Sequence, residues 1–325
     1  MKVNTVLGPI DANELGVTLM HEHIANIEWN LAHAFPGFYD RERVVEMFCE
    51  EMETLKPYGV KTFVDATPIN LGRDVELMRR CSERSGVHII ACTGLYWQER
   101  PFFHIGLDAD VLAELLIREI EQGMEGTDSK PGFIKCASQL HPGETENNRN
   151  MLRAAAIASK ATGLPIYTHT QPGSRLGTYQ KRVFEEEGVA PEKIAYGHGF
   201  ASEDSAYIRS LIKDGSFAGC DQLGFEEGEA MEKLADMLAD LLKSDLRKGI
   251  FLSCDAALWS DFGCTLARNH HDRHTNPMIG YDLRKKNLFE VLLPMLRERA
   301  VEEAVITEVL VGNPRRFFCG GRDVL

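Results

Sequence analysis

The chain has 325 residues, of which 44% are hydrophobic and 26% are charged, so it has the composition of a folded globular protein and not of a disordered one. Its 49 acidic and 36 basic side chains give a net charge of −13, which disfavours nucleic acid and membrane surfaces as partners and leaves a small-molecule substrate. The sequence shows no secretory signal and no apolar stretch of transmembrane length, and its eight cysteines stand singly, so we expect a cytoplasmic protein with reduced thiols.

Short apolar segments rich in Val, Ile, Phe and Thr alternate with longer amphipathic segments along the whole chain, which predicts repeated strand–helix units. A turn-rich segment around Gly8-Pro9 leads into the first strand. The eight predicted strands are 17–23, 61–67, 88–96, 132–138, 165–170, 194–200, 216–223 and 250–257. The predicted helices are 41–56, 74–85, 110–121, 145–161, 177–187, 204–213, 229–242, 283–298 and 301–318.

Each segment between two predicted strands is long enough to hold a crossover helix, and eight such units suffice to close a (β/α)₈ barrel. We therefore predict an α/β protein with one barrel domain over residues 1–325. An open doubly wound sheet is the alternative architecture, but its Gly-x-Gly-x-x-Gly fingerprint follows none of the predicted strands.

Side chains with metal-binding or acid–base chemistry gather where the predicted strands end. Catalytic residues of such barrels come from the carboxyl ends of the strands, so this is where a site is expected. The potential ligands there are His21, His23, Lys135, His169, His198 and Asp255. We expect all of them to face one mouth of the barrel.

The first two of these residues form a His-x-His pair. In an extended strand, side chains two positions apart share a face, so His21 and His23 can both project into the barrel while Glu22 points outward. An isolated pair of this kind is more often ordinary core or surface histidine. Here the other strand-end histidines and Asp255 supply the rest of a shell, and we interpret the pair as metal ligands.

Lys135 lies within an apolar predicted strand, where an unpaired ammonium would be costly. One interpretation is an ion pair with Asp255 across the barrel. The other is that burial beside cations lowers the pKa of Lys135, so that the neutral amine captures carbon dioxide and becomes a carbamate bridging two metal ions. Charge counting favours the carbamate, because it leaves two divalent ions with about one net positive charge where an uncapped lysine leaves about three.

Two divalent ions about 4 Å apart lower the pKa of a shared water to about 7 and polarise the bond that it attacks. This arrangement predicts a hydrolase in which a metal-bridging hydroxide is the nucleophile. Asp255 would bind one ion and accept the proton as the hydroxide attacks, which makes it the predicted catalytic base.

Taken in order along the chain, these motifs make the sequence similar to the phosphotriesterase family of the amidohydrolase superfamily, which includes the phosphotriesterase-like lactonases. The likeness covers nearly the whole chain, and the combination of motifs is far more specific than any single one. It rests on Gly16-Val17-Thr18-Leu19-Met20-His21-Glu22-His23, Gly72-Arg73-Asp74, Gly132-Phe133-Ile134-Lys135, Tyr167-Thr168-His169, Gly197-His198, Asp255 and Asn313-Pro314-Arg315-Arg316-Phe317-Phe318.

This resemblance implies a binuclear metal centre and a homodimer. In such proteins His21, His23 and Asp255 would hold the more buried ion. His169 and His198 would hold the other, with carboxylated Lys135 and a hydroxide as bridges. The family usually binds zinc, and manganese, cobalt and iron are the alternatives.

Features of the loops bear on the substrate. Tyr96 matches a tyrosine that lies near the bridging hydroxide in the lactonases. After the strand-seven aspartate those lactonases have Arg-Tyr-Gly where this chain has Gln222-Leu223-Gly224, which argues against acyl-homoserine lactones. We expect substrate contacts from Tyr96, from Gln222 and from Arg273, which lies in segment 260–280 over the mouth.

The sequence thus predicts a hydrolase of lactones or other carboxylic esters, with weak phosphotriester hydrolysis as a side activity. Two alternatives stay open. One is cyclic amide hydrolysis or deamination, which related superfamily members carry out with similar ligands. The other is a metal-binding protein that has kept the scaffold but lost turnover, against which the intact set of ligands argues.

Overall fold

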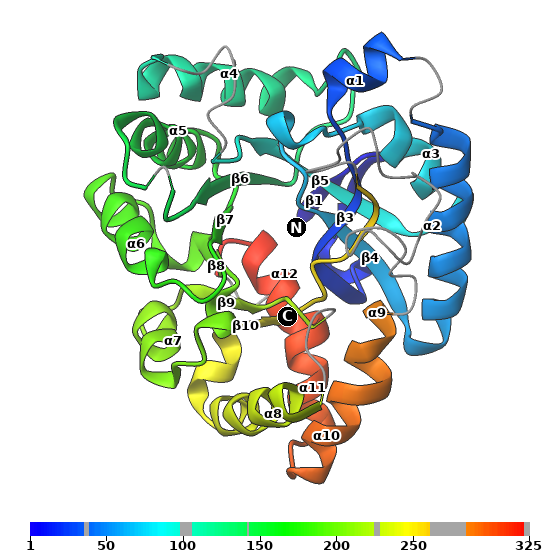
Figure 1. Ribbon diagram of the computed structural model, residues 1–325, viewed down its shortest axis with the longest axis vertical. Coiled ribbons are helices and arrows are strands. Elements are labelled where there is room, and N and C mark those ends of the chain that lie inside the picture. The colour runs from blue at the N-terminus through cyan, green and yellow to red at the C-terminus, as the bar shows by residue number, and fades with distance from the viewer. Residues whose placement is uncertain (36–38, 98–105, 142, 224–227, 261–283, 322–325) are drawn as a thin grey trace.

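The computed structural model describes residues 1–35, 39–97, 106–141, 143–223, 228–260 and 284–321. One curled sheet of nine parallel strands forms its centre, with helices on the outside (Figure 1). The strands of this sheet are β3 (Val17–Asn26), β4 (Val60–Asp65), β5 (His88–Gly94), β6 (Phe133–Ser138), β7 (Ile166–Thr170), β8 (Ile194–Gly197), β9 (Phe217–Cys220), β10 (Ile250–Leu252) and β11 (Ala257–Ser260).

Helices connect the successive strands and cover the sheet with their apolar faces. In α8, buried Met231, Ala235, Leu238 and Leu242 recur every three to four positions and so share one face. The connecting helices are α1 (Trp29–Ala34), α2 (Arg41–Leu55), α3 (Val75–Ser85), α4 (Ala109–Gln122), α5 (Glu146–Thr162), α6 (Leu176–Glu186), α7 (Ser205–Ile212) and α8 (Gly228–Leu242).

Two further helical stretches follow the last strand. In each of them a π-helical turn joins two α-helical pieces, so that each stretch is one continuous rod. The pieces are α9 (Arg284–Asn287) and α10 (Leu293–Glu298) in the first rod, and α11 (Glu303–Thr307) and α12 (Asn313–Phe318) in the second. Both rods were predicted from the sequence, at 283–298 and 301–318, and the structure confirms them over the residues that it describes.

The sheet closes on itself through its last strand. β10 pairs with β9, whereas β11, only a few residues further along the chain, pairs with β3 at the other end of the strand order. Between them, the Asp255 amide donates to the His21 carbonyl at 3.0 Å, and the His23 amide donates to the Ala256 carbonyl at 3.3 Å. β10 and β11 are therefore two halves of an eighth barrel strand, and the predicted (β/α)₈ barrel is confirmed.

Aromatic side chains fill the barrel at the amino ends of its strands. The rings of Phe217 and Phe251 stack with centroids 4.8 Å apart, and Phe317 of α12 packs on both at 5.4 Å. In Figure 1, α12 is drawn in red near the middle of the ring of strands. A separate apolar layer lies between the strands and the surrounding helices. This apolar filling of the amino end agrees with the rule that the sites of such barrels lie at the carboxyl ends of the strands.

The structure differs from the sequence prediction at several points. The predicted strand 194–200 ends at Gly197, because His198 has a φ of +59° and a 3₁₀ helix follows it. The predicted strand 250–257 is broken around Asp255, whose φ of +52° is left-handed and cannot continue a strand. The turn-rich lead-in forms an antiparallel hairpin of β1 (Lys2–Thr5) and β2 (Gly8–Asp11), and α1 was not predicted.

Among the described residues, none of the helices combines the length and the apolar character needed to cross a membrane.

Candidate active site

The six residues predicted as metal ligands lie together at the carboxyl ends of the barrel strands. Five of them are at most 7% exposed, and the Asp255 side chain is 17% exposed. Strand alternation turns the ligands on one strand to the same side. His21 and His23 lie on β3, Lys135 on β6, His169 on β7, His198 directly after β8, and Asp255 between β10 and β11.

One half of the cluster is centred on the first oxygen of Asp255. This Oδ1 lies 3.3 Å from His23 Nε2 and 3.6 Å from His21 Nε2. Ligand atoms of a four-coordinate zinc ion are roughly 3.3 Å apart, given metal–ligand bonds of about 2.0–2.1 Å. The three side chains therefore have the spacing of a metal-binding set.

The other half of the cluster contains the remaining histidines. His198 Nε2 lies 2.9 Å from His169 Nδ1 and 3.8 Å from Asp255 Oδ2. Asp255 thus directs one oxygen toward each half. The 2.9 Å separation is that of a hydrogen bond between the two rings, so both nitrogens point to the same place in the cluster.

Lys135 joins the first half from the opposite wall of the barrel. Its Nζ lies 2.9 Å from His21 Nε2 and 5.2 Å from the centroid of the Tyr167 ring. The ion-pair interpretation called for a contact with Asp255, and the amine lies against a ring nitrogen instead. Burial is the main cause that lowers the pKa of Lys135, which favours the neutral, nucleophilic amine.

Asp221, which sequence analysis did not include among the site residues, holds two of the histidines. Its Oδ2 lies 2.8 Å from His21 Nδ1, and its Oδ1 lies 3.0 Å from His198 Nδ1. Burial opposes its ionisation, but His198 and His21 outweigh burial and hold the pKa of Asp221 well below its usual value. Since an ionised carboxylate only accepts, both rings donate from Nδ1 and turn Nε2 toward the cluster. The sequence feature that could have identified Asp221 is its position directly after β9, the seventh barrel strand.

Thr67 orients His23 in a similar way. The hydroxyl of Thr67 lies 2.8 Å from His23 Nδ1, which leaves Nε2 facing Asp255. Asp65, at the end of β4, accepts from the amides of Ile24 and Thr67, each at 2.9 Å. Asp65 therefore holds the backbone on both sides of this contact, next to His23 on β3 and at Thr67.

Two of the clustered residues have backbones in the left-handed region. His198 has a φ of +59° and Asp255 a φ of +52°. A non-glycine residue in such a conformation costs about 1–3 kcal/mol, and such residues concentrate at functional sites. Two of the six clustered residues therefore carry this backbone cost.

Burial also sets the protonation of the cluster. It lowers the pKa of His21 to about 4, with a further contribution from Lys135, and it lowers the pKa of His169 well below its usual value. Burial would raise the pKa of Asp255, but His21 and His198 outweigh it and hold this pKa below its usual range. Burial would lower the pKa of His198 as well, but Asp221 outweighs it and raises this pKa above its usual value. His21 and His169 are thus neutral imidazoles beside an ionised carboxylate, which suits them to a divalent cation.

The predicted substrate contacts have different outcomes. The Tyr96 hydroxyl lies 3.4 Å from His169 Nε2, at the rim of the cluster. The Gln222 side-chain amide donates to Asp255 Oδ2 at 3.4 Å. Arg273 and most of segment 260–280 lie outside the described residues. Binding of substrate by these three residues stays a prediction.

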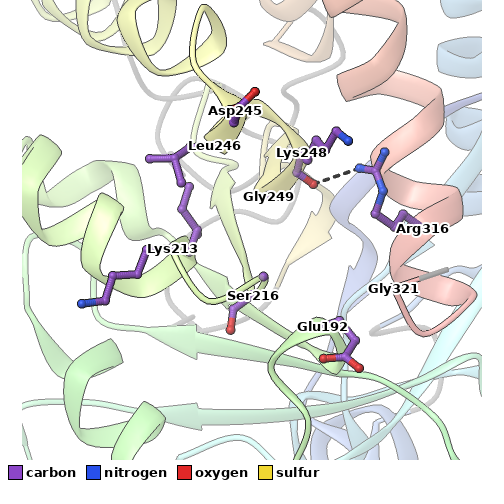
Figure 2. A pocket seen from close by; sticks show the side chains of 11 residues that line it. Glu192, Lys213, Ser216, Asp245, Leu246, Lys248, Gly249, Arg316 and Gly321 are labelled. Atoms are coloured by element: carbon purple, nitrogen blue, oxygen red, sulfur yellow. Dashed lines mark hydrogen bonds between the residues drawn. The ribbon is translucent and has the colours of Figure 1, made fainter. Parts of the chain in front are cut away.

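A cavity of about 390 Å³ lies at the other end of the barrel (Figure 2). Its lining includes Ser216 and Gly249, which come just before β9 and β10. There Arg316 donates to the Lys248 carbonyl at 3.1 Å. None of the clustered histidines lines this cavity, and the amino-terminal end of a barrel serves stability more often than catalysis.

The chain is similar to known proteins over nearly its whole length. The sequence model described as the phosphotriesterase family matches residues 1–318. An aryldialkylphosphatase of Saccharolobus solfataricus is 32% identical over 95% of this chain and 96% of its own. A phosphotriesterase homology protein of Mycobacterium tuberculosis is 32% identical over 98% and 97%, respectively. A phospho-furanose lactonase of Mycoplasmopsis agalactiae is 27% identical over 97% and 90%.

Proposed function

Because the chain belongs to the phosphotriesterase family, we propose that this hydrolase uses two metal ions and acts on lactones or other carboxylic esters. The convergence of four imidazoles, one buried amine and one carboxylate at the barrel mouth carries the proposal. Two relatives support an ester-like substrate by their names, aryldialkylphosphatase and phospho-furanose lactonase.

The donor set fits a nitrogen-rich binuclear site, with zinc as the preferred metal. His21, His23 and Asp255 would hold one ion, and His169 and His198 the other. Lys135 would bridge them as a carbamate: its neutral amine would add to the carbon of carbon dioxide, and the adduct would lose a proton from nitrogen to solvent, which leaves an anionic group. The lowered pKa of the Lys135 amine favours this reaction.

Bound ions would supply a water-derived nucleophile at neutral pH and polarise the ester carbonyl. Asp255 would accept the proton that the nucleophile releases, since its lowered pKa keeps it an ionised carboxylate within the cluster. Asp221 fixes the tautomers of His21 and His198 during the reaction. Tyr96 and Gln222 contact the substrate from the rim of the mouth, and Arg273 does so from segment 260–280, which favours polar or phosphorylated lactones.

A substrate panel tests this proposal. Protein loaded with Zn²⁺ is assayed on lactones, phosphorylated lactones, aryl esters, phosphotriesters and cyclic amides, with its metal content measured in parallel. We expect two ions per chain and a kcat/KM for the best lactone or ester at least about 100-fold above that for phosphotriesters. Activity confined to cyclic amides would contradict the ester proposal, and bound metal without turnover on any substrate would favour a binding protein.

A further inference from the structure

Glu22 lies between two of the clustered histidines on β3 but faces the opposite side of the sheet. Sequence alternation predicted this orientation, and its side chain contacts the surrounding layer instead of the barrel interior. It is fully buried, at 0% exposure. A buried carboxylate requires several hydrogen-bond donors, because an unsatisfied buried charge is strongly destabilising.

The donors to Glu22 come mainly from the break in the eighth barrel strand. Its Oε1 accepts from the Ser253 hydroxyl at 2.6 Å and from the Cys254 amide at 2.8 Å. Its Oε2 accepts from the Ala256 amide at 3.1 Å. The N–H groups on both sides of Asp255 are therefore held by one carboxylate.

The break is where regular pairing of strands fails. Asp255 has a left-handed backbone there, and its own amide donates to the His21 carbonyl at 3.0 Å. The Ser253 hydroxyl also accepts from the His21 amide at 2.9 Å. Glu22 thus ties the backbone of β3, which carries His21 and His23, to the turn that carries Asp255.

A buried lysine completes the arrangement. Lys285 of α9 is 0% exposed, and its Nζ lies 3.8 Å from Glu22 Oε2 and 3.1 Å from Glu51 Oε1. Glu51 belongs to α2, and its Oε1 accepts a hydrogen bond from Lys285. Glu22 contacts Lys285 as well, and in addition it accepts from the strand break. The two glutamates share one cation, and Glu22 alone of the two accepts from Ser253, Cys254 and Ala256.

We propose that Glu22 is a positioning residue that fixes the left-handed turn at Asp255 and so aims the Asp255 carboxylate at the histidine cluster. Its three accepted hydrogen bonds replace the strand pairing that the turn lacks, and Lys285, which it shares with Glu51, lies 3.8 Å from its Oε2. This inference rests on the proposed role of Asp255 as a metal ligand.

The test compares Glu22→Gln with Glu51→Gln, which is the matched control in the same buried charge cluster. The side-chain NH₂ of a glutamine at position 22 would face a donor of the turn and could not accept from it. E22Q therefore loses at least one of the hydrogen bonds that fix the turn. We expect Zn²⁺ affinity, measured by competition with a chelator, to fall about 10- to 100-fold in E22Q and to stay within about threefold of wild type in E51Q. The absorption spectrum of Co²⁺-loaded E22Q should also change, and kcat should fall more than KM rises.

Melting temperatures separate positioning from general destabilisation, because both variants remove a carboxylate beside Lys285 and both should melt lower. Equal metal affinity in E22Q and E51Q would overturn the inference, and wild-type protein that binds no metal would overturn the proposed function along with it. If E22Q does not fold, Ser253→Ala removes the hydroxyl that donates to Glu22 and accepts from the His21 amide, and so cuts the same link between β3 and the turn without changing charge. A severalfold loss of Zn²⁺ affinity in S253A would support the inference, and unchanged affinity would contradict it.

Discussion

At the amino end of the barrel, Phe217, Phe251 and Phe317 pack ring on ring, whereas at the carboxyl end imidazoles, an amine and a carboxylate face one another. Tyr167 spans the two regions, because its ring lies 6.1 Å from that of Phe251 while its hydroxyl donates to Asp221 at 2.8 Å. The apolar end contributes hydrophobic free energy without special backbone geometry. The polar end carries His198 and Asp255, whose backbones are both left-handed. Changes at the two ends should therefore have separable effects.

The largest effect on function is expected from Lys135→Ala at the polar end. Loss of the bridging side chain should reduce bound metal from two ions per chain to one or none. Turnover should fall by at least about 10³-fold, since metal-polarised chemistry is lost. Elemental analysis and ester hydrolysis measure the two effects. Retention of both ions with full turnover would show that Lys135 is not a ligand.

The largest effect on stability is expected from Phe251→Ala at the apolar end. Removing this stacked ring should lower the free energy of unfolding by about 3–5 kcal/mol, because a cavity is left between Phe217 and Phe317. Chemical denaturation measures the loss, and Phe251→Leu is the milder control. Zn²⁺ affinity of the folded variant should match wild type, and a large drop in affinity would refute the separation of the two ends.

An intermediate effect is expected from Asp221→Asn, which acts behind the cluster. An asparagine accepts from one of the two rings and cannot accept from both with the same strength, so His21 or His198 loses its fixed tautomer. Zn²⁺ affinity should fall about 10- to 100-fold. Titration of the metal-free protein in the presence of a competing chelator checks this value, and affinity equal to wild type would remove Asp221 from the site.

The smallest effect is expected from Tyr96→Phe at the rim. The hydroxyl lies 3.4 Å from His169 Nε2, so its removal leaves the cluster in place. We expect KM or kcat to change by about 3- to 30-fold, metal content to stay at two ions, and stability to change by less than about 0.5 kcal/mol. Steady-state kinetics on the best substrate of the panel tests this. Loss of metal in this variant would instead make Tyr96 part of the metal site.

Local sequence patterns were sufficient for much of the fold and for the six clustered residues. Period-two alternation directed His21 and His23 inward and Glu22 outward, and repeated strand–helix units predicted the barrel. These features depend on neighbours within a few positions. The break at Asp255 was missed because it arises from closure of the barrel, where an apolar strand changes partners without any glycine or proline to mark it.

The supporting residues depend on contacts that no local pattern reveals. Asp221 is 200 positions from His21, and Glu22 is 231 positions from Ser253. An aspartate after a strand and a glutamate within one each fit many roles until the fold brings their partners to them. Prediction from sequence therefore reached the cluster itself, but not the carboxylates that orient it.

The junction between the first and eighth barrel strands also constrains biosynthesis. The sequence separation of its contacts exceeds 230 residues, so loop closure of most of the polypeptide must precede their formation. During translation, His21 and His23 leave the ribosome long before Asp255 has been added to the growing polypeptide. A nascent chain therefore cannot assemble the complete donor set, and competence to retain a cofactor arises only late in synthesis, together with closure of the ring.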